Sequence, residues 1–570
     1  MPRSTAPLPG WAPLGVLALL CGSVSARGEA PSFTHGAVAT VHRIATDAGV
    51  QALRDGGNAV DAAIVAGLVL GVVDGHNSGL GGGCLLLVRA PDGPITAIAG
   101  RETAPAAATP GMFLRDGRAD AALSRRGALA VAVPGQVAAF HDAVTSFGRL
   151  PWRYHCGVAA RVAAEGFPVS THYRSRAAGV RDELAADPGA RAIFLRADGT
   201  PPEAGEVLRQ PDLARSLEAL GADGPEWFYR GPFAERVGAW MADHGGVLAA
   251  ADFAAYRAVR REPIRTAFRG RTIVGFPPPS SGGIHVGQIL GILDRFEPAA
   301  PAPEPGAAEH LVAEAMKRAF ADRAFWLGDA DHVPVPRGLL DPEYVAGLAD
   351  GIDPGRATAV ASHGTPPRAG SDLFPPASHT THTSAADAEG WWVACTSTVN
   401  TAFGAKVVVP GTGIVLNNEM DDFVAEPGIP NAFGLVGSAA NAILPGKRPL
   451  SSMAPTLVLE GERPVMALGA AGGPTIISQV VLAIVRSVDG AAGPAAALGA
   501  PRIHHQWSPD RLRVEEGVGP DVIAALRARG HDVETTAAIG AATLVARPRS
   551  DGPFIGAAEP RLEEAAFSGR

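Results

Sequence analysis

The chain has 570 residues and a mass of 58.2 kDa, with 46% hydrophobic and 19% charged residues. This composition is too apolar for an intrinsically disordered protein and too charged for a polytopic membrane protein. The formal net charge of −8 gives no electrostatic reason to expect a nucleic-acid partner.

Residues 1–26 have the layout of a secretory signal peptide. Arg3 is basic, an apolar run extends from Trp11 to Leu20, and small residues precede a cleavage point that we expect after Ala26. The apolar run is too short to cross a bilayer comfortably, so no stable membrane span is expected. The sequence therefore predicts a periplasmic or secreted protein.

A buried helix, a glycine-rich loop and a strand are predicted next. The run from Ala62 to Val73 is apolar throughout but short for a membrane span, which indicates a buried helix. The glycines at 79 and 81–83 precede the strand-like segment Cys84–Arg89. A dinucleotide-binding loop follows its strand instead, so this order argues against nucleotide binding.

The cysteines are few and sparsely placed. Three remain once residues 1–26 are removed, and none forms a C-x-x-C pair. A sparse, odd-numbered set does not make a disulfide framework, so we predict buried, unpaired side chains at Cys84, Cys156 and Cys395.

The middle of the chain is predicted to be mostly helical and to end in a flexible linker at 353–379. This linker is rich in Pro, Gly, Ser, Thr and His and has few large apolar residues. A strand-rich region follows, and then a helix over Thr475–Val488. The predicted strands are Trp391–Thr396, Lys406–Val409, Ile414–Leu416, Thr456–Glu460 and Val465–Leu468.

The end of the linker suggests an N-terminal nucleophile. If the chain is cut between His379 and Thr380, the hydroxyl of Thr380 becomes the nucleophile and its own α-amine the general base. A free α-amine titrates near neutral pH, which suits this role. On the Thr-Thr pair alone, a threonine that simply begins a strand is the more common case.

A glycine pair lies between a predicted strand and a predicted helix. Gly472 and Gly473 would expose backbone N–H groups at the start of that helix, as in an oxyanion hole. The alternative is a tight turn that needs positive φ angles.

Polar residues are dense in this strand-rich region, at Thr396–Asn400, Asn417–Asp422 and Ser451–Ser452. Such groups need partners, either one another or a polar substrate. Carboxylates could hold an ammonium group, and Arg101 could hold a carboxylate with two hydrogen bonds. Together they would suit a zwitterionic amino-acid substrate, although Arg101 alone also fits a surface salt bridge.

Metal binding and cofactors are not indicated. His379 and His382 have an H-x-x-H spacing, and His504 and His505 are adjacent, but neither pair has the carboxylate pattern of a zinc protease. The sequence has no phosphate-binding loop with Lys and Ser/Thr, and no G-x-S-x-G nucleophile motif. We therefore expect no metal and no cofactor.

Long motifs along the chain now identify a family. The chain resembles the γ-glutamyltransferase family, also called γ-glutamyltranspeptidase or glutathione hydrolase, of the N-terminal-nucleophile hydrolases. The similarity extends from about His35 to the C-terminus. The motifs are GGNAVDAA at Gly56, SGLGGG at Ser78, RETAPAAATPGMF at Arg101, PPPSSGGIHVGQIL at Pro277, TTH at Thr380, PGTGIVLNNEMDDF at Pro410 and PGKRPLSSMAPT at Pro445.

The resemblance implies a fold and a maturation step. The fold would be an α/β, four-layer αββα sandwich. The precursor would cut itself into a large subunit, 27–379, and a small subunit, 380–570, which stay associated as a heterodimer. The substrates would be glutathione and other γ-glutamyl compounds, and the γ-glutamyl group would pass to water or to an amino-acid or dipeptide acceptor.

The resemblance also implies roles for individual residues. Thr380 matches the nucleophile, Thr398 a second threonine that hydrogen-bonds to it, and Gly472 and Gly473 the oxyanion-hole donors. The segment 427–437 matches a lid loop over the pocket. The substrate-binding positions are Arg101, Ser451 and Ser452 for the glutamyl α-carboxylate, and Asn400, Glu419 and Asp422 for the α-amino end.

Two other functions remain open from the sequence. Relatives of this fold include glutaryl or cephalosporin acylases and enzymes that act on poly-γ-glutamate, and a glutaryl group also carries a carboxylate. A secreted binding protein on the same scaffold would not cut itself. Its prediction is a chain that stays intact at Thr380.

Overall fold

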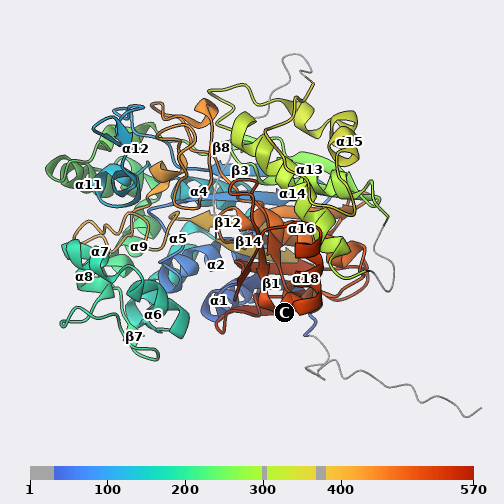
Figure 1. The fold of residues 1–570 in the computed structure, drawn as a ribbon. Helices are drawn as coiled ribbons and strands as arrows, with labels where there is room; N and C mark the ends of the chain where they lie inside the picture. Colours follow the sequence, from blue (N-terminus) through green and yellow to red (C-terminus); the bar gives the residue numbers. More distant parts are fainter. Residues whose placement is uncertain (1–30, 298–303, 368–380) are drawn as a thin grey trace, which may run out of the picture. The chain divides into compact units, whose positions relative to one another are not determined.

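Two antiparallel sheets lie face to face at the centre of the fold (Figure 1). The structure is a computed structural model that describes residues 31–297, 304–367 and 381–570. The predicted signal peptide, residues 368–379 of the predicted linker, and Thr380 lie outside these residues.

The first sheet has seven strands and the second has six, and all neighbouring strands within each sheet are antiparallel. The first runs in the order β20 (Ala566–Gly569), β1 (Gly36–Thr40), β11 (His382–Asp387), β12 (Trp392–Thr398), β2 (Gly83–Arg89), β3 (Ile95–Gly100) and β8 (Val259–Arg261). The second runs in the order β19 (Ile555–Ala557), β18 (Ala541–Ala546), β14 (Arg463–Ala471), β13 (Thr456–Glu460), β10 (Arg271–Gly275) and β9 (Ile264–Phe268).

Successive side chains of a strand point to opposite faces of the sheet, so one strand contributes both to the core between the sheets and to the core beneath the helices. In β2, Leu85 and Leu87 pack between the sheets, whereas Cys84, Leu86 and Val88 face the helices on the other side. Both faces of this strand are buried, which explains why its sequence is continuously apolar instead of alternating.

Helices cover the outer face of each sheet, and Figure 1 shows them on opposite sides of the strands. Those beside the first sheet are α1 (Arg43–Arg54), α2 (Ala59–Val73), α4 (Gln136–Phe147), α5 (Trp152–Glu165) and α9 (Pro211–Asp223). Those beside the second are α13 (Gly282–Leu293), α14 (Ala307–Trp326) and α16 (Thr475–Val488). The order helix, sheet, sheet, helix confirms the predicted αββα sandwich.

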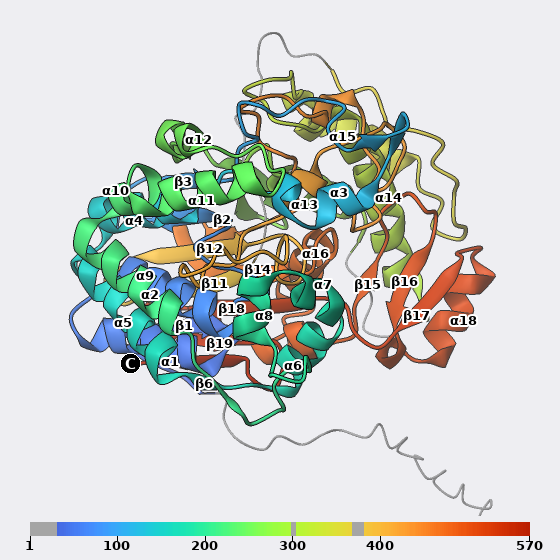
Figure 2. The ribbon, with the colours of Figure 1, turned by 90° about the vertical axis from the view of Figure 1, so that its left-hand side faces the viewer.

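The remaining elements surround this sandwich. A three-stranded sheet, seen with α18 in Figure 2, consists of β15 (Ile503–His504), β16 (Leu512–Glu515) and β17 (Val533–Thr536). The other helices are α3 (Ala121–Arg125), α6 (Thr171–Ala178), α7 (Arg181–Ala186), α8 (Pro188–Phe194), α10 (Pro225–Tyr229), α11 (Pro232–Asp243), α12 (Ala250–Ala255), α15 (Pro342–Asp350), α17 (Pro494–Gly499) and α18 (Pro520–Ala528). Two short hairpins pair β4 (Leu114–Arg115) with β5 (Arg118–Ala119) and β6 (Phe167–Pro168) with β7 (Val207–Leu208). No helix in the described ranges is long and apolar enough to cross a membrane.

One pair of predicted strands is wrong. The segments Lys406–Val409 and Ile414–Leu416 do not form strands and share only an isolated bridge between Val408 and Val415. Lys406, Gly411 and Gly413 all have positive φ angles, so the backbone turns too often to sustain a ladder.

Candidate active site

The ends of neighbouring strands collect the predicted site residues at one edge of the first sheet. Thr398 ends β12 and pairs with Gly83, the first residue of β2. Gly100 ends β3 beside Cys84, and Arg101 follows directly. β11 begins at the same edge, because His382 pairs with Thr396 of β12.

The second sheet brings its own site residues to the same place. Ser451–Ser452 precede β13 and Gly472–Gly473 follow β14, and these strands are antiparallel, so both pairs lie at one end of the sheet. A Cβ atom on Gly469 of β14 would lie 2.3 Å from Nδ1 of His382 on β11. The two strand ends therefore touch, and the predicted residues from both sheets converge.

Arg101 is the centre of a buried ionic cluster. Its Nη2 donates to Oδ2 of Asp422 at 2.9 Å, its Nη1 donates to Oε2 of Glu102 at 3.2 Å and to Glu419, and its Nε donates to the Pro449 carbonyl at 3.1 Å. The Arg101 side chain is fully buried. The alternative of a surface salt bridge is therefore wrong.

Three carboxyl groups surround one guanidinium in this cluster. Burial raises the pKa of Glu102 to about 7 and the pKa values of Glu419 and Asp422 to about 8, against the opposing effect of the guanidinium. Burial alone would lower the pKa of Arg101, but the three carboxylates outweigh it and raise that pKa. The arginine stays charged while the carboxyl groups retain protons near neutral pH.

The loop after β12 is held in a strained conformation beside Thr398. The backbone N–H of Asn400 donates to Oγ1 of Thr398 at 2.7 Å, and Asn400 has a φ of 78°. Its Nδ2 donates to the Asn418 carbonyl at 2.9 Å, while its buried Oδ1 has no partner among the described residues. An unpartnered acceptor at this position is suited to an ammonium or N–H group of a ligand.

The two serines are hydrogen-bonded through their oxygens. The backbone N–H of Met453 donates to Oγ of Ser451 at 2.9 Å, and Nη2 of Arg323 donates to Oγ of Ser452 at 3.1 Å. Both serines are fully buried. Burial lowers the pKa of Arg323 to about 10, partly offset by the charge of Asp422.

The glycine pair forms a turn between β14 and α16. Gly472 and Gly473 have φ angles of 130° and 59°, as the tight-turn interpretation requires. Neither backbone N–H has a hydrogen-bond acceptor in the described part of the chain. The turn therefore also leaves two N–H groups available, and the two sequence interpretations are compatible.

The predicted lid segment 427–437 is hydrogen-bonded to the Arg101 cluster through Asp422. Nδ2 of Asn431 donates to Oδ1 of Asp422 at 3.2 Å, and the N–H of Ala432 donates to Oδ2 of Asp421 at 2.8 Å. The ring of Phe433 lies beside Gly473. This segment thus contacts both the Arg101 cluster, through Asp422, and the glycine turn.

The structure adds residues that sequence reasoning missed. Glu102 and Arg323 both reach the site, but neither was predicted to do so. Glu102 directly follows Arg101, so its position was a usable signal. Arg323 lies far away in the sequence, within a helix, and nothing local distinguishes it.

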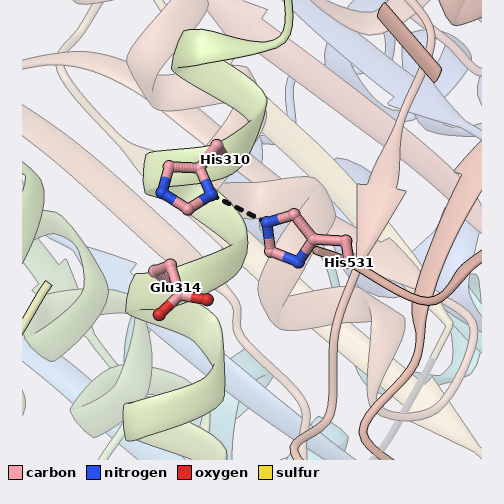
Figure 3. Close-up of side chains that lie close together, drawn as sticks. All are labelled: His310, Glu314 and His531. Atoms are coloured by element: carbon pink, nitrogen blue, oxygen red, sulfur yellow. Dashed lines mark hydrogen bonds between the residues drawn. The ribbon is translucent and has the colours of Figure 1, made fainter. Parts of the chain in front are cut away.

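Three buried side chains away from this site have metal-ligand chemistry (Figure 3). One ligand atom from each of His310, Glu314 and His531 lies within 4.8 Å of the other two. Nε2 of His310 lies 2.8 Å from the Asp353 carbonyl, which only accepts, so this nitrogen carries the proton. His531 Nε2–H then donates to Nδ1 of His310 at 2.8 Å.

The carboxylate of this trio is already engaged. Oε1 of Glu314 pairs with Lys317 at 3.0 Å and Oε2 with Arg318 at 2.9 Å, and the hydroxyl of Thr358 also donates to it. A metal cation would have to compete with both basic groups. We interpret the hydrogen bond between His310 and His531 as a link between α14 and the segment that contains His531. The three residues His310, Glu314 and His531 are called the histidine clasp below.

The other histidines of interest do not form pairs. His382 contacts Thr396 and Ser384, and its partner in the H-x-x-H spacing lies outside the described residues. His504 bonds Ser478, whereas its neighbour His505 bonds a different residue. The cysteines at 84, 156 and 395 are buried and unpaired, as predicted.

Curated proteins are similar in sequence to this chain over most of its length. The glutathione hydrolase proenzyme of Escherichia coli (strain K12) is 42% identical over 530 residues, covering 92% of this chain and 90% of that protein. The acylase ACY 1 proenzyme of Pseudomonas sp. (strain SE83) is 37% identical over 539 residues, covering 92% of each.

Solved structures include the cephalosporin acylase of Bacillus halodurans, with a TM-score of 0.85 at 26% identity over 98% of this chain and 99% of that chain. The γ-glutamyltranspeptidase of Helicobacter pylori has a TM-score of 0.54 at 32% identity, over 56% of this chain and 91% of that chain. The family model for gamma-glutamyltranspeptidase matches residues 45–569. The predicted resemblance is confirmed, and the chain belongs to the γ-glutamyltranspeptidase family.

Proposed function

We propose that the chain is a self-processing γ-glutamyltransferase and glutathione hydrolase. The observation that carries this proposal is the buried Arg101 cluster, which lies at the sheet edge where β11 begins at His382, two residues after Thr380. A cation, several carboxylates and the Asn400 amide oxygen, which has no partner among the residues that the structure describes, suit the two ends of a zwitterionic glutamyl group. Family membership supports the same reaction class.

The proposed reaction has two halves. Oγ of Thr380 attacks the γ-carbonyl carbon, and its proton passes to the α-amine of the same residue. The resulting oxyanion accepts hydrogen bonds from the N–H groups of Gly472 and Gly473, while Thr398 orients the nucleophile. The C–N bond then breaks, the leaving amine takes the proton, and a γ-glutamyl ester remains on Thr380.

The ester is released by a second nucleophile. Attack by water gives glutamate, and attack by the amine of an amino acid or dipeptide gives a new γ-glutamyl peptide. In both cases the hydroxyl of Thr380 recovers its proton from the attacking group through the α-amine.

Substrate recognition divides between the two ends of the glutamyl group. Arg101, Ser451 and Ser452 would bind the α-carboxylate, and Asn400, Glu419 and Asp422 the α-ammonium. Since Asp422 pairs with Arg101 in the ligand-free structure, the incoming carboxylate and ammonium would each replace one half of that ion pair. The γ-carbonyl is thereby positioned at the nucleophile.

Maturation is proposed to remove residues 1–26 on export to the periplasm or medium and to cut between His379 and Thr380. The products are a large subunit, 27–379, and a small subunit, 380–570. The new amine of Thr380 does not exist before this cut, so catalysis depends on it.

N-terminal sequencing and intact mass of the purified protein test the proposal, beside Thr380→Ala and Thr381→Ala variants. We expect a small fragment that begins at Thr380 in the parent, a single uncut chain in Thr380→Ala, and a normal cut in Thr381→Ala. The cleaved parent should release p-nitroaniline from γ-glutamyl p-nitroanilide. An uncut, inactive parent would favour the binding-protein alternative.

A same-fold acylase acting on glutaryl-cephalosporins or poly-γ-glutamate is the second candidate, favoured by the similarity to a cephalosporin acylase. The two candidates differ in their use of the α-amine. Free L-glutamate should inhibit a γ-glutamyltransferase more strongly than glutarate does, because only glutamate offers an ammonium to Asp422. Equal inhibition by both would favour the acylase.

A further inference from the structure

Arg323 on α14 is a buried cation that the proposed mechanism does not use. Its guanidinium donates through Nε to Oγ of Ser281 at 3.0 Å and through Nη2 to Oγ of Ser452 at 3.1 Å. It forms no ion pair with a carboxylate anywhere in the described ranges. The charge of Asp422 offsets only part of the cost of burying this cation, so a carboxylate that arrives with a ligand would add to the compensation.

The hydrogen bonds from Arg323 set the direction of a neighbouring hydroxyl. A guanidinium can only donate, so Ser452 Oγ accepts from it and must direct its own hydrogen toward another acceptor. Ser451 is in the same situation, because its Oγ accepts from the Met453 N–H. Both Oγ atoms thus accept a hydrogen bond from within the fold, and each hydroxyl hydrogen is directed away from that donor.

A loop of the predicted large subunit keeps these serines in place. The N–H of Ser451 donates to the Pro279 carbonyl at 2.6 Å, and the N–H of Ser281 donates to the Ser451 carbonyl at 2.8 Å. The Ser281 hydroxyl donates to the same carbonyl and accepts from Arg323. The second serine of the PPPSSGG motif, Ser281, thus connects Arg323 to the backbone that carries the site serines.

We propose that Arg323 is a positioning and specificity residue that fixes Ser451 and Ser452 as hydrogen-bond donors and selects acyl donors that carry a carboxylate at the α-carboxylate position. This rests on the proposed function, since it assigns the same two serines to that carboxylate. Arg323 acts through the serines and through its charge, and it leaves the reacting carbonyl to other residues. Its loss should therefore change substrate binding more than turnover.

Three acyl donors with the same p-nitroanilide leaving group test this inference. The γ-glutamyl donor has both the carboxylate and the amine, the glutaryl donor keeps only the carboxylate, and the 4-aminobutyryl donor keeps only the amine. For Arg323→Gln we expect KM to rise about 10- to 100-fold for the first two donors, with kcat within about threefold. KM for the 4-aminobutyryl donor should stay unchanged.

Matched variants separate positioning from folding. Arg318→Gln removes another buried arginine of α14, one that pairs with Glu314, and it should lower the melting temperature without changing the KM ratio between donors. Rates are normalised to the cleaved fraction measured by intact mass. If Arg323→Gln does not fold, Arg323→Lys replaces it; a lysine keeps the charge but cannot bridge both serines, so a smaller rise in the same two KM values is expected.

The outcomes are distinguishable. An equal loss with all three donors for the Arg323 variants would mean a purely structural role and would overturn the inference while leaving the proposed function intact. A wild-type enzyme that uses the 4-aminobutyryl donor as well as the γ-glutamyl donor has no carboxylate site. That result would overturn both the site assignment and the role of Arg323.

Discussion

At the residue scale, the substrate-binding role that we propose for the Arg101 cluster makes binding depend on the protonation of its carboxyl groups. One guanidinium faces the carboxyl groups of Glu102, Glu419 and Asp422, and burial raises the pKa of each carboxyl group. A protonated Asp422 cannot attract the α-ammonium of a substrate. Binding should therefore depend on pH in a range where free carboxylates would show no titration.

We expect KM for γ-glutamyl p-nitroanilide to fall as pH rises from 6 to 8.5. The carboxyl pKa of Asp422 is raised to about 8, so its ionised form, which binds the ammonium, becomes populated across this range. An Asp422→Asn variant should bind weakly at every pH and lose this dependence. A KM that is flat in the wild type, or equally sloped in the variant, would assign the ammonium to another group.

At the element scale, the sequence predicted the bounds of several helices and strands but not the contacts between residues distant in the chain. The helix Thr475–Val488 and the strand Thr456–Glu460 match the predicted bounds, since an apolar stripe or a buried run determines each locally. The predicted pair around Val408 failed because repeated positive φ angles override strand propensity. The role proposed for Arg323 depends on Ser281 before α13 and Ser452 before β13, which only the fold brings to α14, so no local pattern could indicate it.

The turn between β14 and α16 gives a test of the glycine pair. Gly473 has a φ of 59°, and a Cβ atom there would lie 2.6 Å from Cδ1 of Phe433 in the predicted lid. Gly473→Ala should therefore displace the lid and the proposed oxyanion donor together, lowering kcat about 100-fold or more. The control is Gly493→Ala, because Gly493 has a φ of −64° and open space around it. Similar kcat values for the two variants would show that this turn is not part of the catalytic site.

The histidine clasp predicts a loss of stability in acid. Burial, together with Lys317 and His310, lowers the pKa of His531 to about 4 from its ordinary 6.5. Below pH 6.5 the unfolded chain therefore binds more protons at His531 than the folded chain does, and the stabilisation present above 6.5 is lost as pH falls toward 4. At pH 5 this amounts to about 2 kcal/mol.

Urea denaturation at pH 7.5 and pH 5 measures this effect. Other buried histidines also destabilise the fold in acid, so the useful quantity is the difference between wild type and His531→Gln. We expect the variant to lose about 2 kcal/mol less than wild type between the two pH values, and a variant of the exposed His244 to behave as wild type does. Equal losses in wild type and His531→Gln would mean that His531 does not titrate in this range.

At the scale of the whole molecule, the proposed cut divides both sheets between two chains. In the first sheet β11 lies between β1 and β12, so a strand of the small subunit pairs with a strand of the large one on one side. The small-subunit strand β20 pairs with β1 on its other edge. In the second sheet β10 pairs with β13 across the same division. The αββα fold was predicted from the family resemblance. The pairing of strands from both predicted subunits within each sheet was not, and it bears on the stability of the mature protein.

The two subunits should be inseparable without unfolding. Pulling them apart breaks the ladders β1–β11, β1–β20, β2–β12 and β10–β13, and exposes the apolar layer between the sheets to water. Gel filtration of the cleaved enzyme in native buffer should give one peak at the elution volume of the uncut Thr380→Ala chain. In a urea series, loss of the joint peak and loss of circular dichroism should share one midpoint. A small fragment that elutes alone before the circular dichroism changes would mean that the cut lies elsewhere in the sheet order, because a cut at Thr380 leaves β11 hydrogen-bonded to β1 of the other subunit.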